Sequence, residues 1–479
     1  MRRFPVKLIM PKTENFAAVV LAAGLGTRMK SELPKVLHYL GDMSLAERAI
    51  RKVAALGPDG IIVITGHKAE LVEAELAKKL PPEIFSKVVF VRQQLLKGSG
   101  RAVQEAMHEV RKYDHVMVLC GDAPLFRVST VRRMKALYFR RGPDCLVMTA
   151  DLASPGSYGR IKRDHAGSVA AIIEAADADE WDKAIKEVNS GTYFFGAKAL
   201  EKAVKDLRKK GSKGEYYLTD AVENIIKAGG RAEAFKLDDA TEMTGINSRA
   251  DLAAAYAMLC RRKSADLMAS GVTVVDPANT YIDESVSVGR DTVIFPGVFM
   301  RGNTVIGKAC KIGPAGVIEN CRIDDGVTVK YSCVLESSRM RQGAVVGPFA
   351  RLRPLSDIGP SAEIGNFAEV KKSRIGRGSK MHHHSYVGDT EMGEKVNIGA
   401  GTITCNYDGV HKNRTVIGAG AFIGSNTNLV APVKLGAGAF TAAGSTITDD
   451  VPGGALAIAR ARQVVKHRSP KGADKKRTK

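Results

Sequence analysis

The chain has 479 residues, of which 44% are hydrophobic and 26% charged, a composition typical of a folded globular protein. At roughly 100–200 residues per domain, this length predicts two to four domains. No apolar run approaches the roughly 18 residues of a membrane-spanning helix, and none of the seven cysteines forms a C-x-x-C pair. Membrane insertion, a disulfide framework and a zinc site are therefore disfavoured, and we expect a cytoplasmic protein with reduced thiols.

Positive charge dominates, because 72 Lys and Arg against 51 Asp and Glu give a formal net charge of +21. This excess favours anionic partners, either phosphorylated small molecules or nucleic acid. Residues 460–479 form a basic C-terminal tail, but they lack the aromatic side chains that bind single-stranded nucleic acid. We therefore interpret the tail as a solvated end and expect no nucleic-acid partner. We also expect residues 1–15 to be a disordered lead-in.

Residues 16–248 alternate short β-branched runs with amphipathic helical patterns. The runs cover residues 17–21, 61–64, 88–91 and 116–119, with helical stretches such as 44–55 and 68–80 between them. This alternation predicts an α/β domain with a mostly parallel, Rossmann-like sheet covered by helices on both faces. Ligands of such sheets bind beyond the carboxyl ends of the strands. Residues 249–271 then form one helical pattern, which we interpret as a linker helix.

Residues 272–459 carry a six-residue repeat. Aliphatic residues recur at this spacing, often followed by Gly: Ile306, Ile312 and Ile318; Val346, Leu352, Ile358, Ile364 and Val370; Ile417, Ile423, Leu429, Leu435 and Ile447. Six matches neither the period of a helix nor that of a half-buried strand, and a hexapeptide repeat is the signature of a parallel β-helix. Residues 399–414 interrupt the repeat, and a loop inserted into a rigid solenoid usually carries function.

A loop of small residues, Leu21 to Gly24, follows the first β-branched run, and Arg28 and Lys35 come after it. It is neither a dinucleotide fingerprint, because Met29 takes the third glycine position, nor a Walker A loop. The backbone N–H groups of such a loop can approach a phosphate, with Arg28 and Lys35 as flanking cations. An ordinary strand-to-helix turn is the alternative.

A second candidate site follows residues 116–119, where Cys120, Gly121 and Asp122 stand at the end of a predicted strand. An Asp at this position suits a divalent cation held by one carboxylate and by phosphate oxygens. A turn or a helix cap explains the same residues without a ligand.

Three adjacent histidines, His382, His383 and His384, lie in the hexapeptide region. Successive side chains of an extended chain point to opposite faces, so all three are not expected to chelate one metal ion. Histidine is also a common general base near neutral pH. A solvated polar corner is the remaining interpretation.

The loop and the Asp motif, at this spacing, resemble those of the nucleoside-diphosphate-sugar pyrophosphorylases. With the hexapeptide half, the chain from Phe16 to Arg460 resembles the bacterial family of bifunctional N-acetylglucosamine-1-phosphate uridyltransferase/glucosamine-1-phosphate acetyltransferases. The resemblance implies a nucleotidyltransferase domain followed by a left-handed parallel β-helix. It implies acetylation of glucosamine-1-phosphate by acetyl-coenzyme A, then transfer of UMP from UTP to the product with release of pyrophosphate, feeding peptidoglycan and lipopolysaccharide precursors. It also implies a homotrimer whose acetyl site is shared between neighbouring prisms.

For uridylyl transfer, the resemblance implies that Lys35 meets phosphate as a catalytic cation, that Gln93 recognises uracil, and that Asp122 and Asn247 bind Mg²⁺. Ser99 stands where the family has Thr and conserves the hydroxyl, and Arg101 stands where the family often has His. The implied nucleotide- and sugar-binding residues are Leu21, Ala22, Ala23, Gly24, Arg28, Lys35, Gln93, Gly98, Ser99, Cys120, Gly121, Asp122, Gly159, Glu174, Asn189 and Asn247.

For acetyl transfer, the resemblance selects His383 as the general base for the attacking amine, because the family's base precedes a Tyr by three positions. His382 and His384 replace small or apolar residues of the family pattern. Direct attack by the amine is expected, because Cys405 has no base beside it in the sequence. The implied ligands are Arg353, Lys371, Tyr386 and Asn397 for glucosamine-1-phosphate, and Ala400, Asn406, Tyr407, Ser425, Ala443 and Arg460 for acetyl-coenzyme A, with Lys412 nearby.

Two other functions compete with this one. The first is a sugar-1-phosphate nucleotidyltransferase whose β-helix only regulates or assembles. The second is a non-enzymatic nucleic-acid-binding or scaffold protein, which the net charge and the basic tail suggest.

Overall fold

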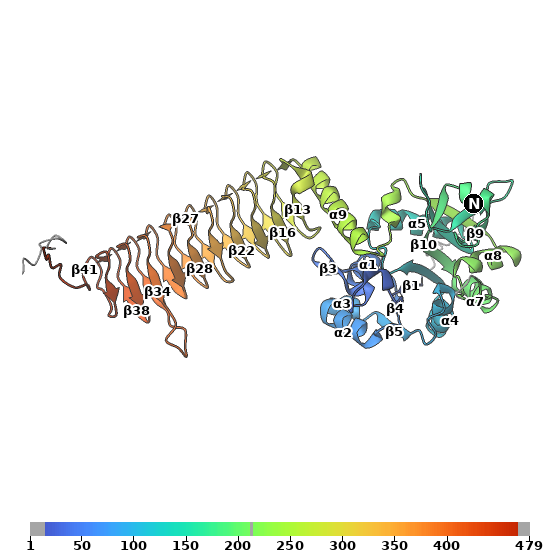
Figure 1. Ribbon diagram of the computed structural model, residues 1–479, viewed down its shortest axis with the longest axis horizontal. Helices are drawn as coiled ribbons and strands as arrows, with labels where there is room; N and C mark the ends of the chain where they lie inside the picture. The colour runs from blue at the N-terminus through green and yellow to red at the C-terminus, as the bar shows by residue number, and fades with distance from the viewer. Residues whose placement is uncertain (1–14, 211–213, 468–479) are drawn as a thin grey trace, which may run out of the picture. The chain divides into compact units, whose positions relative to one another are not determined.

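Residues 15–210 and 214–467 are described by the computed structural model, in which the chain divides into two compact units between Met258 and Leu259 (Figure 1). The expected lead-in, apart from Asn15, and the basic tail beyond residue 467 lie outside the described residues. Each unit has a hydrophobic core of its own.

The N-terminal unit is built on a sheet whose main path runs β11–β7–β10–β6–β1–β4–β5. These strands are β1 (Phe16–Leu21), β4 (Gly60–Thr65), β5 (Val88–Arg92), β6 (His115–Cys120), β7 (Cys145–Asp151), β10 (Glu187–Gly196) and β11 (Ala232–Lys236). Neighbours on this path pair in parallel, except that β10 is antiparallel to both β6 and β7. The predicted mostly parallel sheet is confirmed, and all four predicted runs lie in its strands.

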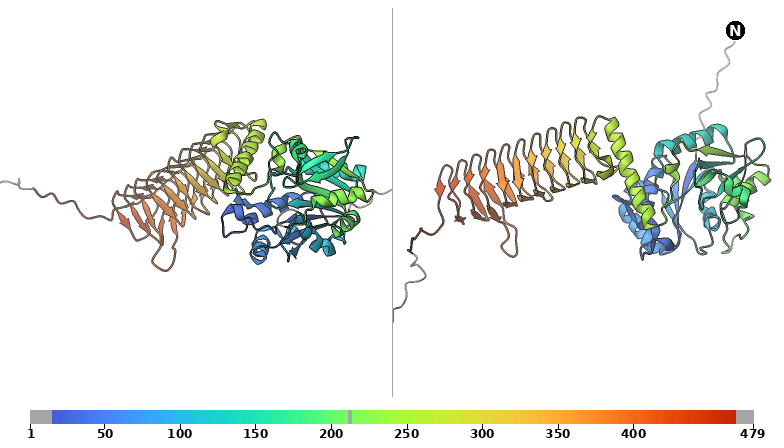
Figure 2. Two further views of the ribbon diagram at one scale, coloured as in Figure 1. Left: turned by 45° about the vertical axis from the view of Figure 1, so that its right-hand side comes forward. Right: turned by 45° about the horizontal axis from the view of Figure 1, so that its top comes forward.

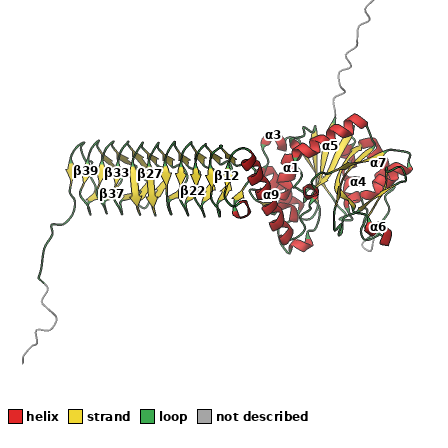
Figure 3. Cartoon of the chain, turned by 90° about the horizontal axis from the view of Figure 1, so that it is seen from above, coloured by secondary structure: helices red, strands yellow, loops and turns green. Residues whose placement is uncertain are grey.

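Helices cover both faces of this sheet, as the sequence predicts (Figure 3). Along β1, Ala18 and Val20 point into one core with α1 and α5, whereas Ala17 and Val19 point into the other with α4, α7 and α8. Both faces of the strand are therefore buried, which explains its near-continuous apolar sequence. The helices are α1 (Leu45–Ala54), α2 (Ala69–Lys79), α3 (Pro82–Phe85), α4 (Ser99–Val110), α5 (Val128–Arg141), α6 (Glu180–Ala184), α7 (Ala197–Lys205) and α8 (Thr219–Lys227).

A hairpin of β8 (Arg160–Arg163) and β9 (Val169–Ile173) extends the sheet beside β10. The pairing of β10 with β7 shifts register between Asn189 and Tyr193. A bulge of this kind bends a strand and re-aims its side chains. The sequence analysis gave no sign of this antiparallel element.

The helix α9 (Arg249–Ala269) spans the division between the units, and a left-handed parallel β-helix follows it. Three parallel sheets form the sides of the β-helix over the described residues, and their strands stack coil upon coil (Figure 2). The first sheet runs from β12 (Thr273–Val274) to β41 (Leu456–Ala457), the second from β13 (Tyr281–Ile282) to β40 (Thr446–Ile447), and the third from β14 (Ser287–Val288) to β38 (Val433–Leu435).

The six-residue repeat places its aliphatic residues on the axis of the β-helix. Ile312, Leu352 and Ile358 are each 0% exposed, in one continuous core. One coil cannot bury such residues alone, so the stack depends on contact between neighbouring coils. The predicted parallel β-helix is confirmed.

Leu352 and Leu355 provide a test of this core, since Leu352 is 0% exposed and Leu355 is 70% exposed. We expect Leu352→Ala to lower the free energy of unfolding of the β-helix by about 2–5 kcal/mol, because it leaves a cavity on the axis. The matched variant Leu355→Ala should stay within about 0.5 kcal/mol. Denaturant unfolding monitored by circular dichroism measures both, and equal losses would contradict the axial assignment.

Candidate functional site

Parallel pairing of β1 with β6 brings the first two sequence motifs together. Leu21 is in register with Cys120, and the Gly121 N–H donates to the Leu21 carbonyl at 2.9 Å. The loop after β1 and the residues after β6 therefore lie side by side at the carboxyl edge of the sheet. This is the edge where the strand pattern predicts a ligand.

Lys35, Asp122 and Asn247 meet at this edge. The Lys35 ammonium donates to a carboxylate oxygen of Asp122 and, at 3.0 Å, to the amide Oδ1 of Asn247. The Ile246 N–H donates to the Asp122 carbonyl at 2.8 Å, which holds the two segments together. Carboxylate and amide oxygens are ligands that Mg²⁺ accepts. The two oxygens converge on a cation, so these residues fit a divalent metal.

The N-terminus of α9 holds Asn247 in place. The Asp251 carboxylate accepts the backbone N–H groups of Asn247 at 3.0 Å and Ser248 at 2.8 Å, and Ser248 Oγ accepts the Asp251 N–H at 3.2 Å. This reciprocal pattern is a capping box. Burial acts to raise the pKa of Asp251, but these hydrogen bonds and the Arg28 charge outweigh it and lower that pKa. Asp251 was missed in the sequence analysis, although the Ser-x-x-Asp spacing was visible.

The loop after β1 packs tightly on the Lys35 backbone. Gly26 has a φ of +63°, and a Cβ there would lie 2.6 Å from the Cβ of Lys35. Only Gly fits both the left-handed conformation and the close approach. Gly24 has open space around it, so its backbone is accessible to a ligand.

The expected uracil-recognising segment folds against the start of α8. Gln93 is buried, and its amide nitrogen donates to the carbonyls of Leu95 at 2.8 Å and Gly98 at 3.2 Å. Ser99 Oγ accepts the Leu218 N–H at 3.2 Å. Arg101 pairs with Glu105 on its own helix at 2.8 Å, so its guanidinium is already held in an ion pair.

The three residues implied for the sugar are brought together by the hairpin and β10. The Asn189 N–H donates to the Gly159 carbonyl at 2.9 Å, and a Cβ at position 159 would lie 3.7 Å from Glu174 Oε2. Burial raises the pKa of Glu174, and a 2.8 Å hydrogen bond from the Thr219 hydroxyl opposes that rise. Thr219 follows Leu218, which bonds Ser99, so the sugar and uracil segments are neighbours. Thr219 was missed in the sequence analysis.

In the β-helix, the residues implied for acetyl-coenzyme A form a column at one corner. The Asn426 N–H donates to the Ala400 carbonyl at 2.7 Å, and the Gly444 N–H donates to the Ser425 carbonyl at 2.8 Å. Ala443 completes this stack of turns. The turns follow β33 (Asn397–Ile398), β36 (Phe422–Ile423) and β39 (Phe440–Thr441), which pair in that order after β30 (Lys380–His383). His383 ends β30 and so lies at the start of the column.

The three histidines are all exposed, because β30 ends at His383 and the chain turns there. The strict alternation of faces that the sequence analysis assumed is therefore wrong beyond His382. Among the described residues, no group of three or more His, Cys, Asp or Glu side chains is arranged to hold a metal ion.

Positive charge gathers on the second sheet. The positive charge of Lys412 lowers the pKa of Lys371, and that of Arg353 adds to this effect. Arg353 directly follows β25 (Arg351–Leu352), and Lys371 ends the neighbouring strand β28 (Glu369–Lys371). Arg353 also pairs with Glu369 at 3.0 Å. Cations this close are stabilised by a shared anion, and a phosphate group is suitable. The sequence analysis placed Lys412 near the cofactor, and the structure adds it to this cluster.

Tyr386 and Asn406 converge on Gly388, where a Cβ would overlap the Tyr386 hydroxyl and lie 2.9 Å from the Asn406 amide nitrogen. That nitrogen donates to Asp389 at 2.6 Å. Asn397, in contrast, begins β33 on the first sheet. The four residues implied for glucosamine-1-phosphate are therefore spread over two faces of one prism.

The interruption of the repeat is shorter than the predicted 399–414, because β34 (Ile403–Cys405) still pairs within the second sheet. The interrupting loop is residues 406–414, which project from the β-helix between β34 and β35 (Thr415–Ile417) (Figure 1). Asp408 accepts the N–H groups of His411 at 2.6 Å and Val410 at 2.8 Å, and these bonds lower its pKa. The loop is thus ordered by its own side chains. Tyr407 on this loop and Arg460 beyond β41 are both exposed.

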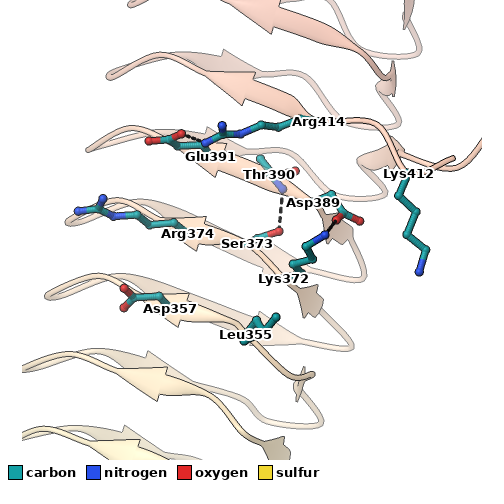
Figure 4. Close-up of a pocket in the computed structure, with 10 residues that line it drawn as sticks. All are labelled: Leu355, Asp357, Lys372, Ser373, Arg374, Asp389, Thr390, Glu391, Lys412 and Arg414. Atoms are coloured by element: carbon teal, nitrogen blue, oxygen red, sulfur yellow. Dashed lines mark hydrogen bonds and ion pairs between the residues drawn. The ribbon is translucent and has the colours of Figure 1, made fainter.

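A cavity of ≈ 530 Å³ opens where this loop meets the third sheet (Figure 4). Its charges are largely paired within it: Lys372 with Asp389 at 3.1 Å, and Arg414 with Glu391. Lys412, which the resemblance places near the cofactor, also lines it, whereas none of the other implied site residues does, and we assign the cavity no ligand of its own.

Known proteins similar to this chain cover most of its length. A MobA-like NTP transferase domain matches residues 18–206, and a bacterial transferase hexapeptide (six repeats) matches residues 414–449. The "Bifunctional protein GlmU" of Heliobacterium modesticaldum is 47% identical over 87% of this chain and 89% of its own. Those of Pelotomaculum thermopropionicum (48% identity; 88% and 90%) and Geobacillus sp. (45%; 87% and 89%) are similar.

The chain belongs to the GlmU family. It is a bifunctional transferase of UDP-N-acetylglucosamine synthesis, with uridyltransferase and glucosamine-1-phosphate acetyltransferase activities, and its substrates are small molecules. The resemblance found in the sequence motifs is confirmed, and membership favours two activities over a β-helix that only assembles or regulates. Within the described residues, no helix has the length and hydropathy needed to span a bilayer.

The environment of Cys120 yields a chemical test of the N-terminal site. Burial, together with the Asp122 charge, raises the pKa of this thiol to about 12. At pH 8 only about one Cys120 in 10⁴ is then a thiolate, so the thiol is not a nucleophile. We expect iodoacetamide to leave the Cys120 peptide unmodified in the folded protein and to alkylate it after denaturation, as measured by mass spectrometry. Rapid alkylation of the folded protein would contradict this environment.

Proposed function

We propose that uridylyl transfer occurs at the carboxyl edge of the N-terminal sheet, on residues Leu21–Gly24, Lys35, Asp122 and Asn247. The observation that carries this assignment is the convergence of Asp122 and Asn247 on the Lys35 ammonium. Asp122 and Asn247 are the residues that would hold Mg²⁺. The ion would take the place that the Lys35 ammonium has between their oxygens. When bound, Mg²⁺ neutralises phosphate charge during the reaction.

In this reaction a phosphate oxygen of N-acetylglucosamine-1-phosphate attacks the α-phosphorus of UTP, and pyrophosphate leaves in line. Positioning and charge neutralisation supply most of the catalysis in such phosphoryl chemistry. The backbone N–H groups of Leu21–Gly24 and the cations Arg28 and Lys35 hold the triphosphate. Gln93, Gly98 and Ser99 surround the uracil.

The sugar of the acceptor contacts Gly159, Glu174 and Asn189. Two observations support this grouping. The backbones of Gly159 and Asn189 are hydrogen-bonded, and Glu174 lies next to Gly159. The Thr219 hydroxyl holds the Glu174 carboxyl. Cys120 and Gly121 are proposed to line the site beside Asp122.

Acetyl transfer is proposed at the corner of the β-helix that begins with His383. The column of turns containing Ala400, Ser425 and Ala443 supports the cofactor assignment, because it leads directly from His383. The imidazole accepts a proton from the amine of glucosamine-1-phosphate as nitrogen attacks the thioester carbonyl, and that proton then passes to the departing coenzyme A thiolate. Asn406, Tyr407 and Arg460 are proposed as further cofactor contacts.

The phosphate of glucosamine-1-phosphate is proposed to bind Arg353, Lys371 and Lys412. The repulsion by which Lys412 lowers the pKa of Lys371 supports this assignment, since a bound dianion would relieve it. Tyr386 and Asn397 are the remaining contacts of the sugar phosphate.

We further propose a homotrimer. Asn397 and Lys371 lie on different faces of one prism, which supports a site assembled from neighbouring copies of the chain. A cytoplasmic location is proposed as well, because UTP and acetyl-coenzyme A are metabolites of that compartment.

Reciprocal variants test the two assignments. We expect Asp122→Asn to abolish uridylyl transfer and to spare acetyl transfer, because it removes the proposed metal carboxylate. His383→Ala should lower acetyl transfer by roughly 10²–10⁴-fold, as expected for a lost general base, and should spare uridylyl transfer. Pyrophosphate release and coenzyme A thiol release measure the two reactions. Equal loss of both activities in either variant would contradict separate sites.

Sedimentation equilibrium tests the trimer. We expect a mass three times the 51.3 kDa of one chain. Mixing His383→Ala with Lys371→Ala chains should also restore part of the acetyl transfer, because mixed trimers contain some sites with both native residues. A monomer that retains full acetyl transfer would contradict the shared site.

A further inference from the structure

His382 and His384 flank the proposed base, and neither has a role in the function proposed above. Of the three rings, that of His382 is held by a carboxylate, because its Nε2 lies 2.8 Å from Glu363 Oε2. The other carboxylate oxygen of Glu363 lies 3.6 Å from the Lys380 ammonium. Glu363 and His382 belong to adjacent coils, so their bond links the base-bearing coil to the coil before it.

The strands that carry this link have an unusual length. β27 (Glu363–Asn366) and β30 (Lys380–His383) each have four residues, whereas the other strands described in the first sheet have two. Their pairing extends to Asn366 opposite His383. A Cβ at Gly365 would overlap the His382 carbonyl, so Gly at this position permits the close approach of the two strands. The backbone of the proposed base is therefore tied to the Glu363 coil.

The His383 ring has less support than its backbone. The His383 carbonyl accepts the Ser385 hydroxyl at 2.7 Å, and the His384 N–H donates to Asn366 at 3.0 Å. In the described part of the chain, no hydrogen bond to either ring nitrogen of His383 is found. Its neighbour is the His382 ring, whose centroid is 6.1 Å away at an interplanar angle of 87°. Whatever fixes the His382 ring therefore limits where the His383 ring can turn.

The charge of Glu363 also acts near the base. The hydrogen bond from His382, followed by the Lys380 charge, lowers the pKa of Glu363, so it is ionised at neutral pH. His382 and Lys380 are the titratable groups that face this carboxylate.

We propose that Glu363 and His382 form a positioning clamp for His383. The clamp holds the end of β30 and the His382 ring in place, and the His383 ring is oriented against that neighbouring ring. The clamp rests on the proposed role of His383 as general base. Both residues are positioning residues, because they act through His383 and not on the substrate.

A double-mutant cycle tests this clamp in the full-length protein. We expect Glu363→Gln and His382→Asn each to lower kcat for acetyl transfer by about 3–10-fold, with KM for glucosamine-1-phosphate changed less than about twofold. The double variant should be no slower than the slower single variant, because either change alone breaks the pair. Glu394→Gln is the matched control, since Glu394 faces Arg377 at 4.0 Å on another corner, and it should change nothing.

Circular dichroism separates positioning from mere loss of folded protein. It measures the folded fraction of each variant, so a kcat that falls while the folded fraction and KM stay at the wild-type level reports positioning of the base.

The possible results distinguish failure of the clamp from failure of the proposal that His383 is the general base. Wild-type kcat in both single variants, or losses that add in the double variant, would overturn the clamp even where His383→Ala abolishes acetyl transfer. Retention of acetyl transfer in His383→Ala would overturn the base assignment and the clamp together. Uridylyl transfer should remain unchanged in every variant.

Discussion

In-register parallel strand pairing is the constraint on which both candidate sites depend. In the N-terminal unit, pairing of β1 with β6 sets Leu21 beside Cys120 and so brings the phosphate-type loop against Asp122. In the β-helix, pairing of β27 with β30 sets Asn366 beside His383 and brings Glu363 to His382. A slip of one residue in either pairing would turn these side chains to the opposite face. Buried aliphatic side chains on both strands make such a slip costly.

The two units use this constraint for different chemistry. At the sheet edge, the Lys35 ammonium lies against the oxygens of Asp122 and Asn247, which we propose to hold a metal ion in its place. On the β-helix, the positive charges of Lys412 and Arg353 lower the pKa of Lys371, although Arg353 also pairs with Glu369. In the proposed function, uridylyl transfer relies on preorganised charge, whereas acetyl transfer adds a proton acceptor, for which His383 is proposed. Neither site needs a protein nucleophile, which agrees with the raised pKa of the buried Cys120 thiol.

The sequence predicts the parts of the fold that repeat. The β-branched runs give β1, β4, β5 and β6, because a strand buried on both faces is apolar throughout, and the six-residue period gives the β-helix axis. Local spacing could not predict the antiparallel β10 or its bulge, since these depend on contacts between strands distant in the sequence. The meeting of Lys371 with Lys412 was missed for the same reason, as it depends on how the inserted loop folds back. The alternation assumed for the three histidines failed because the strand ends within them.

A structure determined with Mg²⁺ and UDP-N-acetylglucosamine tests most directly whether strand register assembles the nucleotide site. The account predicts a metal ion between Asp122 and Asn247, the Lys35 ammonium moved onto a phosphate oxygen, and the diphosphate against the backbone of Leu21–Gly24. Lys35 still lodged between the two oxygens, with the metal ion and the diphosphate bound away from this edge, would contradict it.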